Sequence, residues 1–220
     1  MIDLGNLLEQ VGHGMPPPAD GGMSLLPAPP GKASAAVLGF TNHHVIAADA
    51  DPGWVMLRLG EARGADLGRA MQPDFLSELG AHLRARPGGQ DVLLVAASRA
   101  TSGLARETVI SSTMRNSRVD RALRYRDDVQ VATMPGGLVT AGRGLGGRWE
   151  VSIEVDPGRR GAGLGRVLAD LGRTLVPEGE LVWAQVHPAN VASLRVFLAA
   201  GFRPVGAEVL FTEDSSGPPR

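Results

Sequence analysis

Hydrophobic positions in the C-terminal half of the chain follow two kinds of pattern. Trp149, Val151, Ile153 and Val155 occupy every second position, which predicts a strand at 148–155 with one buried face. Leucine and valine between 163 and 175 recur every three or four positions, which predicts a helix packed on a sheet. The same criteria predict helices at 117–127 and 190–200 and strands at 129–134, 137–143, 181–187 and 204–212. This order predicts an α/β (α+β) chain with a mixed, mostly antiparallel twisted sheet flanked by helices.

The N-terminal half carries weaker patterns and no recognisable motif. Proline and glycine are dense from residue 12 to residue 32, so we expect 1–35 to be flexible or extended, apart from a short amphipathic helix in its first ten residues. Apolar runs predict strands at 36–48, 54–59 and 91–97, and helical spacing predicts a helix at 74–86. We therefore divide the chain into 1–35, an N-terminal part of the fold or a degenerate half-copy of it at 36–110, a core at 111–213 and a disordered tail at 214–220.

Composition excludes several classes of function. The 220 residues are 43% hydrophobic, as in soluble globular proteins, and no apolar run approaches the ~18 residues of a membrane span. The net charge of -1 argues against general nucleic-acid binding, which needs a basic surface. The absence of cysteine excludes disulfides and thiolate metal sites, and the adjacent His43 and His44 would point to opposite faces of a strand, so we predict no metal site. Because the N-terminus lacks a secretory signal, we expect a cytoplasmic location.

The strongest candidate for chemistry is the small-residue loop Arg160–Gly165, which joins the strand at 148–155 to the helix at 163–175. A loop that opens a helix leaves backbone N–H groups unpaired, and the helix dipole adds partial positive charge at that end. Glycine lets a ligand approach those amides closely, and Arg159, Arg160 and Arg166 add formal charge. The segment therefore predicts a seat for a phosphate or pyrophosphate group.

The spacing within this loop narrows the choice of ligand. A dinucleotide fingerprint needs a third glycine where Arg166 stands, and an NTPase phosphate loop needs a lysine, but the only lysine is Lys32. The pattern Arg-x-x-Gly-x-Gly instead resembles the coenzyme A loop of the GNAT superfamily of N-acetyltransferases. A second segment, from Asn190 to Phe202, is similar to that superfamily's pattern Asn-x-x-Ser/Ala-x-x-x-Tyr-x-x-x-Gly-Phe. The close resemblance covers residues 148 to 204.

The resemblance implies acetyl-CoA as co-substrate and a set of residues that bind it. The backbone around Ile153 and Val155 would hold the pantetheine arm and polarise the thioester carbonyl. The pyrophosphate would lie on Arg160, Gly161, Ala162, Gly163, Leu164, Gly165 and Arg166. The pantetheine would be flanked by Asn190, Ser193 and Phe197. Capping of its helix explains Asn190 equally well.

The implied activity is transfer of an acetyl group from acetyl-CoA to a primary amine on a small molecule, a peptide or a protein, with residues 36–110 on the acceptor side and a homodimer as a further possibility. Because an alkyl amine is mostly protonated at neutral pH, a base helps the reaction. Glu150 and Glu154 lie on the strand face opposite Trp149 and are the candidate bases, unless both are solvated surface charges.

One departure from the superfamily pattern supports a second reading. Phe197 stands where these proteins often have a tyrosine that protonates the departing thiolate, and phenylalanine has no proton to give. A thiol with a pKa near 8.5 leaves without much help, so activity remains the leading hypothesis. The alternative is a catalytically weak or inactive coenzyme A-binding regulatory or interaction protein.

Overall fold

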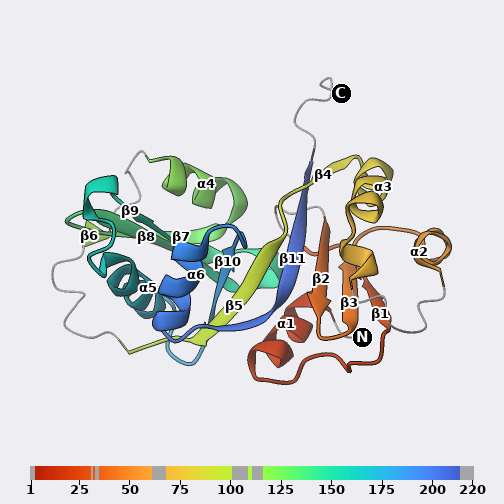
Figure 1. The fold of residues 1–220 in the computed structure, drawn as a ribbon, viewed down its shortest axis with the longest axis horizontal. Coiled ribbons are helices and arrows are strands. Elements are labelled where there is room, and N and C mark those ends of the chain that lie inside the picture. Colours follow the sequence, from red (N-terminus) through yellow and green to blue (C-terminus); the bar gives the residue numbers. More distant parts are fainter. Residues whose placement is uncertain are drawn as a thin grey trace. The chain divides into compact units, whose positions relative to one another are not determined.

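The computed structural model describes residues 3–30, 32, 35–60, 68–100, 109–110 and 116–213, and Figure 1 shows its strands and helices. The chain divides into two compact units, which we call unit 1 (Met1–Asp91 with Val205–Arg220) and unit 2 (Val92–Pro204). The boundaries of these units lie between residues 91 and 92 and between 204 and 205, and the predicted division into 36–110 and 111–213 stays a prediction. The tail predicted at 214–220 lies outside the described residues.

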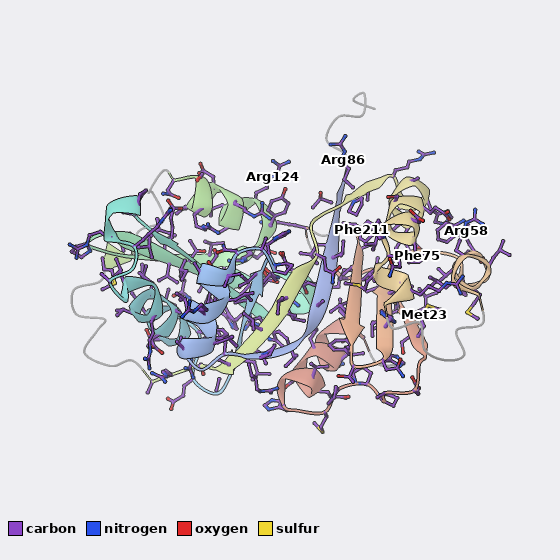
Figure 2. The ribbon with its side chains drawn as sticks, in the orientation of Figure 1. Met23, Arg58, Phe75, Arg86, Arg124 and Phe211 are labelled. Atoms are coloured by element: carbon purple, nitrogen blue, oxygen red, sulfur yellow. The ribbon has the colours of Figure 1, made fainter. Side chains whose placement is uncertain are left out.

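Unit 1 is built on a sheet with the strand order β1 (Met23–Leu26), β3 (His43–Ala47), β2 (Ala35–Phe40) and β11 (Arg203–Glu213), and β4 (Ala85–Pro87) also pairs with β11. β1 and β3 are parallel, and the other pairs are antiparallel. Its helices are α1 (Leu4–Gly12), α2 (Pro52–Leu59) and α3 (Pro73–Leu83). Phe75 of α3 and Phe211 of β11 are buried in one apolar core, and both are labelled in Figure 2.

The strand predicted at 54–59 is wrong, because this segment is the helix α2. Its start is fixed by Asp51, whose side chain accepts a hydrogen bond of 2.8 Å from the N–H of Trp54, and by Pro52 in the first turn. Val55 and Leu59 are four residues apart and both buried, as a helix with one apolar face requires. The capping signal lay in the sequence and outweighs the β-propensity of Trp54 and Val55.

Other predictions for unit 1 are confirmed with changes. The segment 36–48, predicted as one strand, forms a hairpin of the two strands β2 and β3. Asn42 lies in the turn at φ +52°, a conformation that asparagine tolerates. The helix predicted at 74–86 is α3, but it ends at Leu83 because Arg84 turns into the left-handed region at φ +54°. The first ten residues contain the predicted helix α1, and the segment 1–35 also contains the strand β1, which was not predicted.

Unit 2 is built on a sheet with the strand order β5 (Asp91–Ala97), β10 (Leu181–Val186), β9 (Trp149–Val155), β8 (Gly137–Arg143), β7 (Asp127–Met134) and β6 (Val109–Ile110). β9 and β10 are parallel, and the other neighbours are antiparallel. The helices are α4 (Ser117–Tyr125), α5 (Leu164–Thr174) and α6 (Val191–Ala199). The fold class predicted from the sequence, a mixed and mostly antiparallel sheet with flanking helices, is therefore confirmed.

The helices of unit 2 cover both faces of this sheet (Figure 1). Leu168 and Leu171 of α5 pack on Val139 of β8, whereas Val119 of α4 packs on the adjacent Leu138. Neighbouring residues of a strand point to opposite faces, so α4 and α5 lie on opposite sides of the sheet. Phe197 of α6 joins the same core as Val151, which places α6 on the α5 side. The even-numbered face of β9 is thus the α4 side.

The strands β11 and β5 pair with strands that are distant from them in the sequence. β11 comes directly after α6, and we had predicted it within the core at 111–213, but it pairs with β2 of unit 1. β5 comes from the N-terminal half and pairs with β10 of unit 2 over six residue pairs. The physical reason for the position of β11 is that Val209 and Phe211 are buried in the core of unit 1. Among the described residues, no helix is long and apolar enough to cross a membrane.

Candidate functional site

The two parallel strands at the centre of unit 2 separate soon after they meet. Their pairing consists of Val182 with Trp149 and Trp183 with Glu150, although β9 continues to Val155 and β10 to Val186. β10 instead stays paired with β5 along its whole length, and β9 stays paired with β8. From residue 151 onward, one edge of β9 therefore has no partner strand in the described part of the chain.

The register of β9 shows which backbone groups face this open edge. The N–H of Gly144 donates to the carbonyl of Arg148 and the N–H of Asp156 donates to the carbonyl of Gly136, which sets the even-numbered positions of β9 towards β8. In an antiparallel pair these directions alternate. The N–H and C=O groups of Val151, Ile153 and Val155 therefore point into the separation between β9 and β10. Such a row of peptide groups binds an extended chain that carries its own amides.

The loop that follows β9 places a group of amides at the same end of the strand. Gly161 and Gly163 take positive φ angles of +79° and +82°, and Gly163 precedes α5 without any side-chain cap. Within the described ranges, the N–H groups from Gly161 to Gly165 have no hydrogen-bond partner in the protein. Gly161, Ala162 and Gly163 are exposed. This arrangement joins unpaired donors to the positive end of an eleven-residue helix, as an anion site requires.

The arginines of the loop have distinct positions. The Nε of Arg160 donates to the carbonyl of Val155 at 3.3 Å, which ties the loop to the end of β9. Arg159 lies against Gly136 in the turn between β7 and β8, and Arg166 is exposed in the first turn of α5. Gly165 is buried, and a Cβ there would lie 3.1 Å from the side chain of Val196, so this glycine brings α5 close to α6. The predicted phosphate-binding residues thus surround the start of α5.

Of the three candidates at α6, Asn190 precedes the helix, Ser193 is partly buried in its first turn, and Phe197 lies near its end. Asn190 caps the helix, because its Oδ1 accepts a hydrogen bond of 3.1 Å from the N–H of Ser193, so the capping role that the sequence left open is filled. Phe197 is only 3% exposed and packs edge-on against Phe202 with ring centroids 5.0 Å apart. It belongs to the apolar core between α6 and the sheet. Its ring is therefore a packing group.

Glu150, the first candidate base, lies in a buried network of hydrogen bonds. One carboxylate oxygen accepts from Arg126 Nε at 3.0 Å, and the other accepts from Arg148 Nε at 2.9 Å, Gln185 Nε2 at 2.8 Å and the N–H of Leu145 at 3.2 Å. Burial alone would raise the pKa of Glu150, but Arg148 and Arg126 outweigh it and hold the pKa below its ordinary value. A carboxylate stabilised in this way is a poor proton acceptor, which disfavours Glu150 as the base.

Glu154, the second candidate, is more accessible on the same face of β9. Its side chain is 35% exposed, and its carboxylate lies 3.7 Å from Arg118 Nε and accepts a hydrogen bond from Asn116 at 3.4 Å. Between the two glutamates, the hydroxyl of Ser152 lies 2.7 Å from that of Thr140. The even face of β9 therefore carries a row of polar groups, and Glu154 is the one nearest the loop.

Several residues of this region were not predicted from the sequence. Arg126, Arg148 and Gln185 hold Glu150, and Arg148 also lies over the ring of Trp183. The alternation of β9 placed Glu150 on the correct face, but no local signal links it to Arg126 or Gln185, which are 24 and 35 residues away in the sequence. Among the described residues there is no cluster of three or more side chains suited to bind a metal ion.

A scan against protein families and a search of curated proteins found no match. Solved structures with a similar fold include GNAT acetyltransferases. A GCN5-related N-acetyltransferase from Kribbella flavida is 13% identical, with a TM-score of 0.40 over 64% of this chain and 64% of that one. A GCN5-related N-acetyltransferase from Sphaerobacter thermophilus is 13% identical, with a TM-score of 0.38 over 63% and 55% of the two chains.

An acetyltransferase of the GNAT family from Colwellia psychrerythraea is 13% identical, with a TM-score of 0.35 over 64% of this chain and 63% of that one. This chain thus covers less than two thirds of the length of these structures. They belong to the superfamily that the segments at 160–165 and 190–202 resemble. At these scores the similarity concerns the arrangement of strands and helices and says nothing about activity.

Proposed function

We propose that this protein is an acetyl-CoA-dependent N-acetyltransferase that acts on a primary amine. The observation that supports the proposal most is the joint position of two sets of backbone groups that pair with no helix or strand in the described ranges. The amides of Gly161–Gly165 open α5, and the edge of β9 that ends at Val155 adjoins them. Coenzyme A carries a diphosphate joined to an extended arm with two amide groups, so it matches a helix N-terminus followed by an unpaired strand edge.

The chemistry follows from this placement. With the diphosphate on the loop, the pantetheine arm extends along the odd-numbered backbone groups of β9, and an N–H of that edge polarises the thioester carbonyl. The amine nitrogen attacks the carbonyl carbon and forms a C–N bond. Collapse of the tetrahedral intermediate breaks the C–S bond and releases coenzyme A as a thiolate, whose conjugate acid has a pKa near 8.5. The amine loses one proton to a base, and the amide product is neutral.

We assign the base to Glu154, acting directly or through a water molecule. Glu150 lies on the same face of β9, but Arg126, Arg148 and Gln185 occupy its carboxylate. Glu154 keeps an exposed carboxylate at the end of the strand nearest the loop. General-base assistance is worth about 10²–10⁴ in rate, so loss of this carboxylate has a measurable effect.

A second function, coenzyme A binding without turnover, is favoured by one specific observation. Phe197 stands where a tyrosine would protonate the thiolate, and it is buried against Phe202. A protein of this kind would bind coenzyme A and its acyl forms at the same loop and would act as a sensor. It differs from an enzyme in a single measurable respect, the release of free thiol.

The test is calorimetry with acetyl-CoA, followed by thiol release over a panel of small primary amines and amine-bearing peptides. We expect binding and turnover, with kcat lowered at least about 100-fold in Glu154→Gln. Glu180→Gln is the matched control, because Glu180 is 41% exposed and also pairs with an arginine, Arg143 at 3.0 Å. Binding without turnover on any amine would favour the sensor, and absence of binding would overturn both proposals. Equal kcat values for the two variants would remove Glu154 as the base.

A further inference from the structure

Unit 1 contains three side chains in the order of a charge-relay system. Ser24 lies in β1, His43 is the first residue of β3, and Asp20 lies in the loop before β1. The hydroxyl of Ser24 is 3.0 Å from Nε2 of His43, and Nδ1 of the same ring is 2.8 Å from Oδ1 of Asp20. All three belong to unit 1, and none is part of the proposed acetyl-CoA site.

The strand register explains why the serine and the histidine meet. β1 and β3 are parallel, and Ser24 is directly opposite Val45. His43 lies two residues before Val45, so its side chain is on the same face as Val45 and diagonal to Ser24. His44 points to the opposite face, which excludes it from the group. The contact is therefore fixed by backbone pairing on both strands.

The position of Asp20 is held by its own loop. Its Oδ1 accepts a hydrogen bond of 2.7 Å from the N–H of Gly22, and the N–H of Gly21 donates to the carbonyl of Asn42 next to His43. A Cβ at Gly22 would come within 2.7 Å of that carboxylate oxygen, so only glycine allows this approach. The hydrogen bond from His43, with that from Gly22, lowers the pKa of Asp20 and keeps it ionised.

An ionised Asp20 sets the direction of both hydrogen bonds. A carboxylate only accepts, so Nδ1 of His43 carries the proton and donates it to Asp20. In the neutral imidazole Nε2 is then a proton acceptor, and the Ser24 hydroxyl donates to it. This is the polarity in which a histidine removes the proton of a serine nucleophile.

The three side chains differ in their exposure to solvent. His43 is 7% exposed, which protects the imidazole from water, whereas the side chain of Asp20 is 51% exposed and Ser24 is partly exposed. β1 is the end strand of the sheet within unit 1. The N–H of His44 donates to Gly22 and that of Ala48 to Leu26, so the even-numbered residues of β1 pair with β3. The amides of Met23 and Leu25 then face the other edge, on either side of the serine.

We propose that Ser24, His43 and Asp20 form a second reactive site, in which Ser24 is a nucleophile towards carboxylic esters and other activated acyl groups. The Oγ of Ser24 bonds to the acyl carbon while its proton passes to Nε2 of His43. The bond to the alkoxide then breaks, and the alkoxide takes that proton and leaves as the alcohol. Water attacks the acyl-serine and gives its proton to Nε2, and Ser24 recovers it as the carboxylic acid departs. The sum is ester plus water to acid plus alcohol.

The test is covalent labelling of the folded full-length protein with a fluorophosphonate, which loses fluoride to an activated serine. We expect labelling at Ser24, located by peptide mapping, and slow hydrolysis of p-nitrophenyl acetate. Ser24→Ala should abolish both, and His43→Gln should lower the labelling rate at least about 100-fold. Ser98→Ala is the matched control, because Ser98 is a partly exposed serine at the end of a strand, and it should keep the wild-type rate.

The wild-type protein alone decides the outcome if a variant fails to fold. Labelling of Ser24 in the folded protein, and none when the protein is denatured before the reagent is added, supports an activated nucleophile, because the reaction then requires the folded arrangement. No label on the folded protein, label on another serine, or equal labelling of Ser24 in protein denatured beforehand would overturn the proposal and leave the three residues as a structural link between β1 and β3. Acetyl-CoA binding measured in parallel should be unchanged by Ser24→Ala.

Discussion

Replacement of Gly163 by alanine separates the role of this glycine in ligand binding from its role in folding. Gly163 has a φ of +82°, and a Cβ built on it meets no atom of the protein within 4 Å. The cost to the free protein is therefore the backbone strain of alanine in the left-handed region, about 1–2 kcal/mol. For a chain of this size, that strain lowers Tm by about 2–8 °C.

The effect on binding has a different origin. In the function that we propose, a diphosphate reaches the amides at the start of α5 through the open space beside Gly163. A methyl group there interferes with at least one hydrogen bond to a charged oxygen, worth about 1.5–3 kcal/mol. At 1.4 kcal/mol per factor of ten, Kd for acetyl-CoA should rise about 10- to 150-fold.

Gly179→Ala is the matched control for this prediction. Gly179 lies in an exposed turn before β10, has a φ of +89°, and also has no atom within 4 Å of a built Cβ. The two variants should lose similar stability in thermal unfolding, and calorimetry should show weaker acetyl-CoA binding only in Gly163→Ala. Equal Kd values for the two variants would refute the assignment of this loop to the diphosphate.

Two further changes test the environments of Glu150 and Phe197. Glu150→Gln removes the carboxylate between Arg126 and Arg148 and should lower the free energy of unfolding in urea by about 3–5 kcal/mol. Because the folded pKa of Glu150 is lowered, the carboxylate contributes its full stabilisation above the unfolded pKa of about 4.3 and loses it as pH falls through the folded pKa. Acid should therefore lower the free energy of unfolding less in the variant than in wild type. Parallel curves of stability against pH would contradict this. Phe197→Tyr buries a hydroxyl in the core, so it should cost about 1–3 kcal/mol of stability without raising kcat. A faster variant would place residue 197 beside the thiolate instead.

The sequence predicted unit 2 well because its signals are local. Alternation predicts β9, helical spacing predicts α5, and the glycine before Phe202 marks the end of α6. Each signal depends only on neighbouring residues, and all three elements are present. The error at α2 also concerns a local signal: Asp51 and Pro52 start a helix, and this signal outweighs the β-propensity that predicts a strand at 54–59. Strand pairing is not local, so neither the position of β5 beside β10 nor that of β11 beside β2 was predicted.

The same difference between local and non-local signals applies to the residues of the candidate site. The loop at 160–165 was predicted from its composition, and within the described ranges the amides from Gly161 to Gly165 are unpaired. Glu150 was placed on the correct strand face, but its burial depends on Arg148, two residues before it, and on Arg126, which reaches it from another segment. The Ser24–His43–Asp20 group was missed entirely, because it requires the parallel register of β1 on β3 and a β1 strand inside a proline-rich segment.

The pairing of β11 also has a consequence for the order in which the protein folds as it is synthesised. β2 is made early, and its partner in the register, at Ala207 opposite Gly39, emerges from the ribosome about 170 residues later, on the order of ten seconds or more at 5–20 residues per second. The sequence of unit 2 is uninterrupted and is complete before that partner appears. Until then, the nascent N-terminal strands have an unpaired edge and an uncovered apolar face, a state that chaperones and proteases recognise. A chain that ends at a stop codon after residue 204 would keep this unpaired edge permanently.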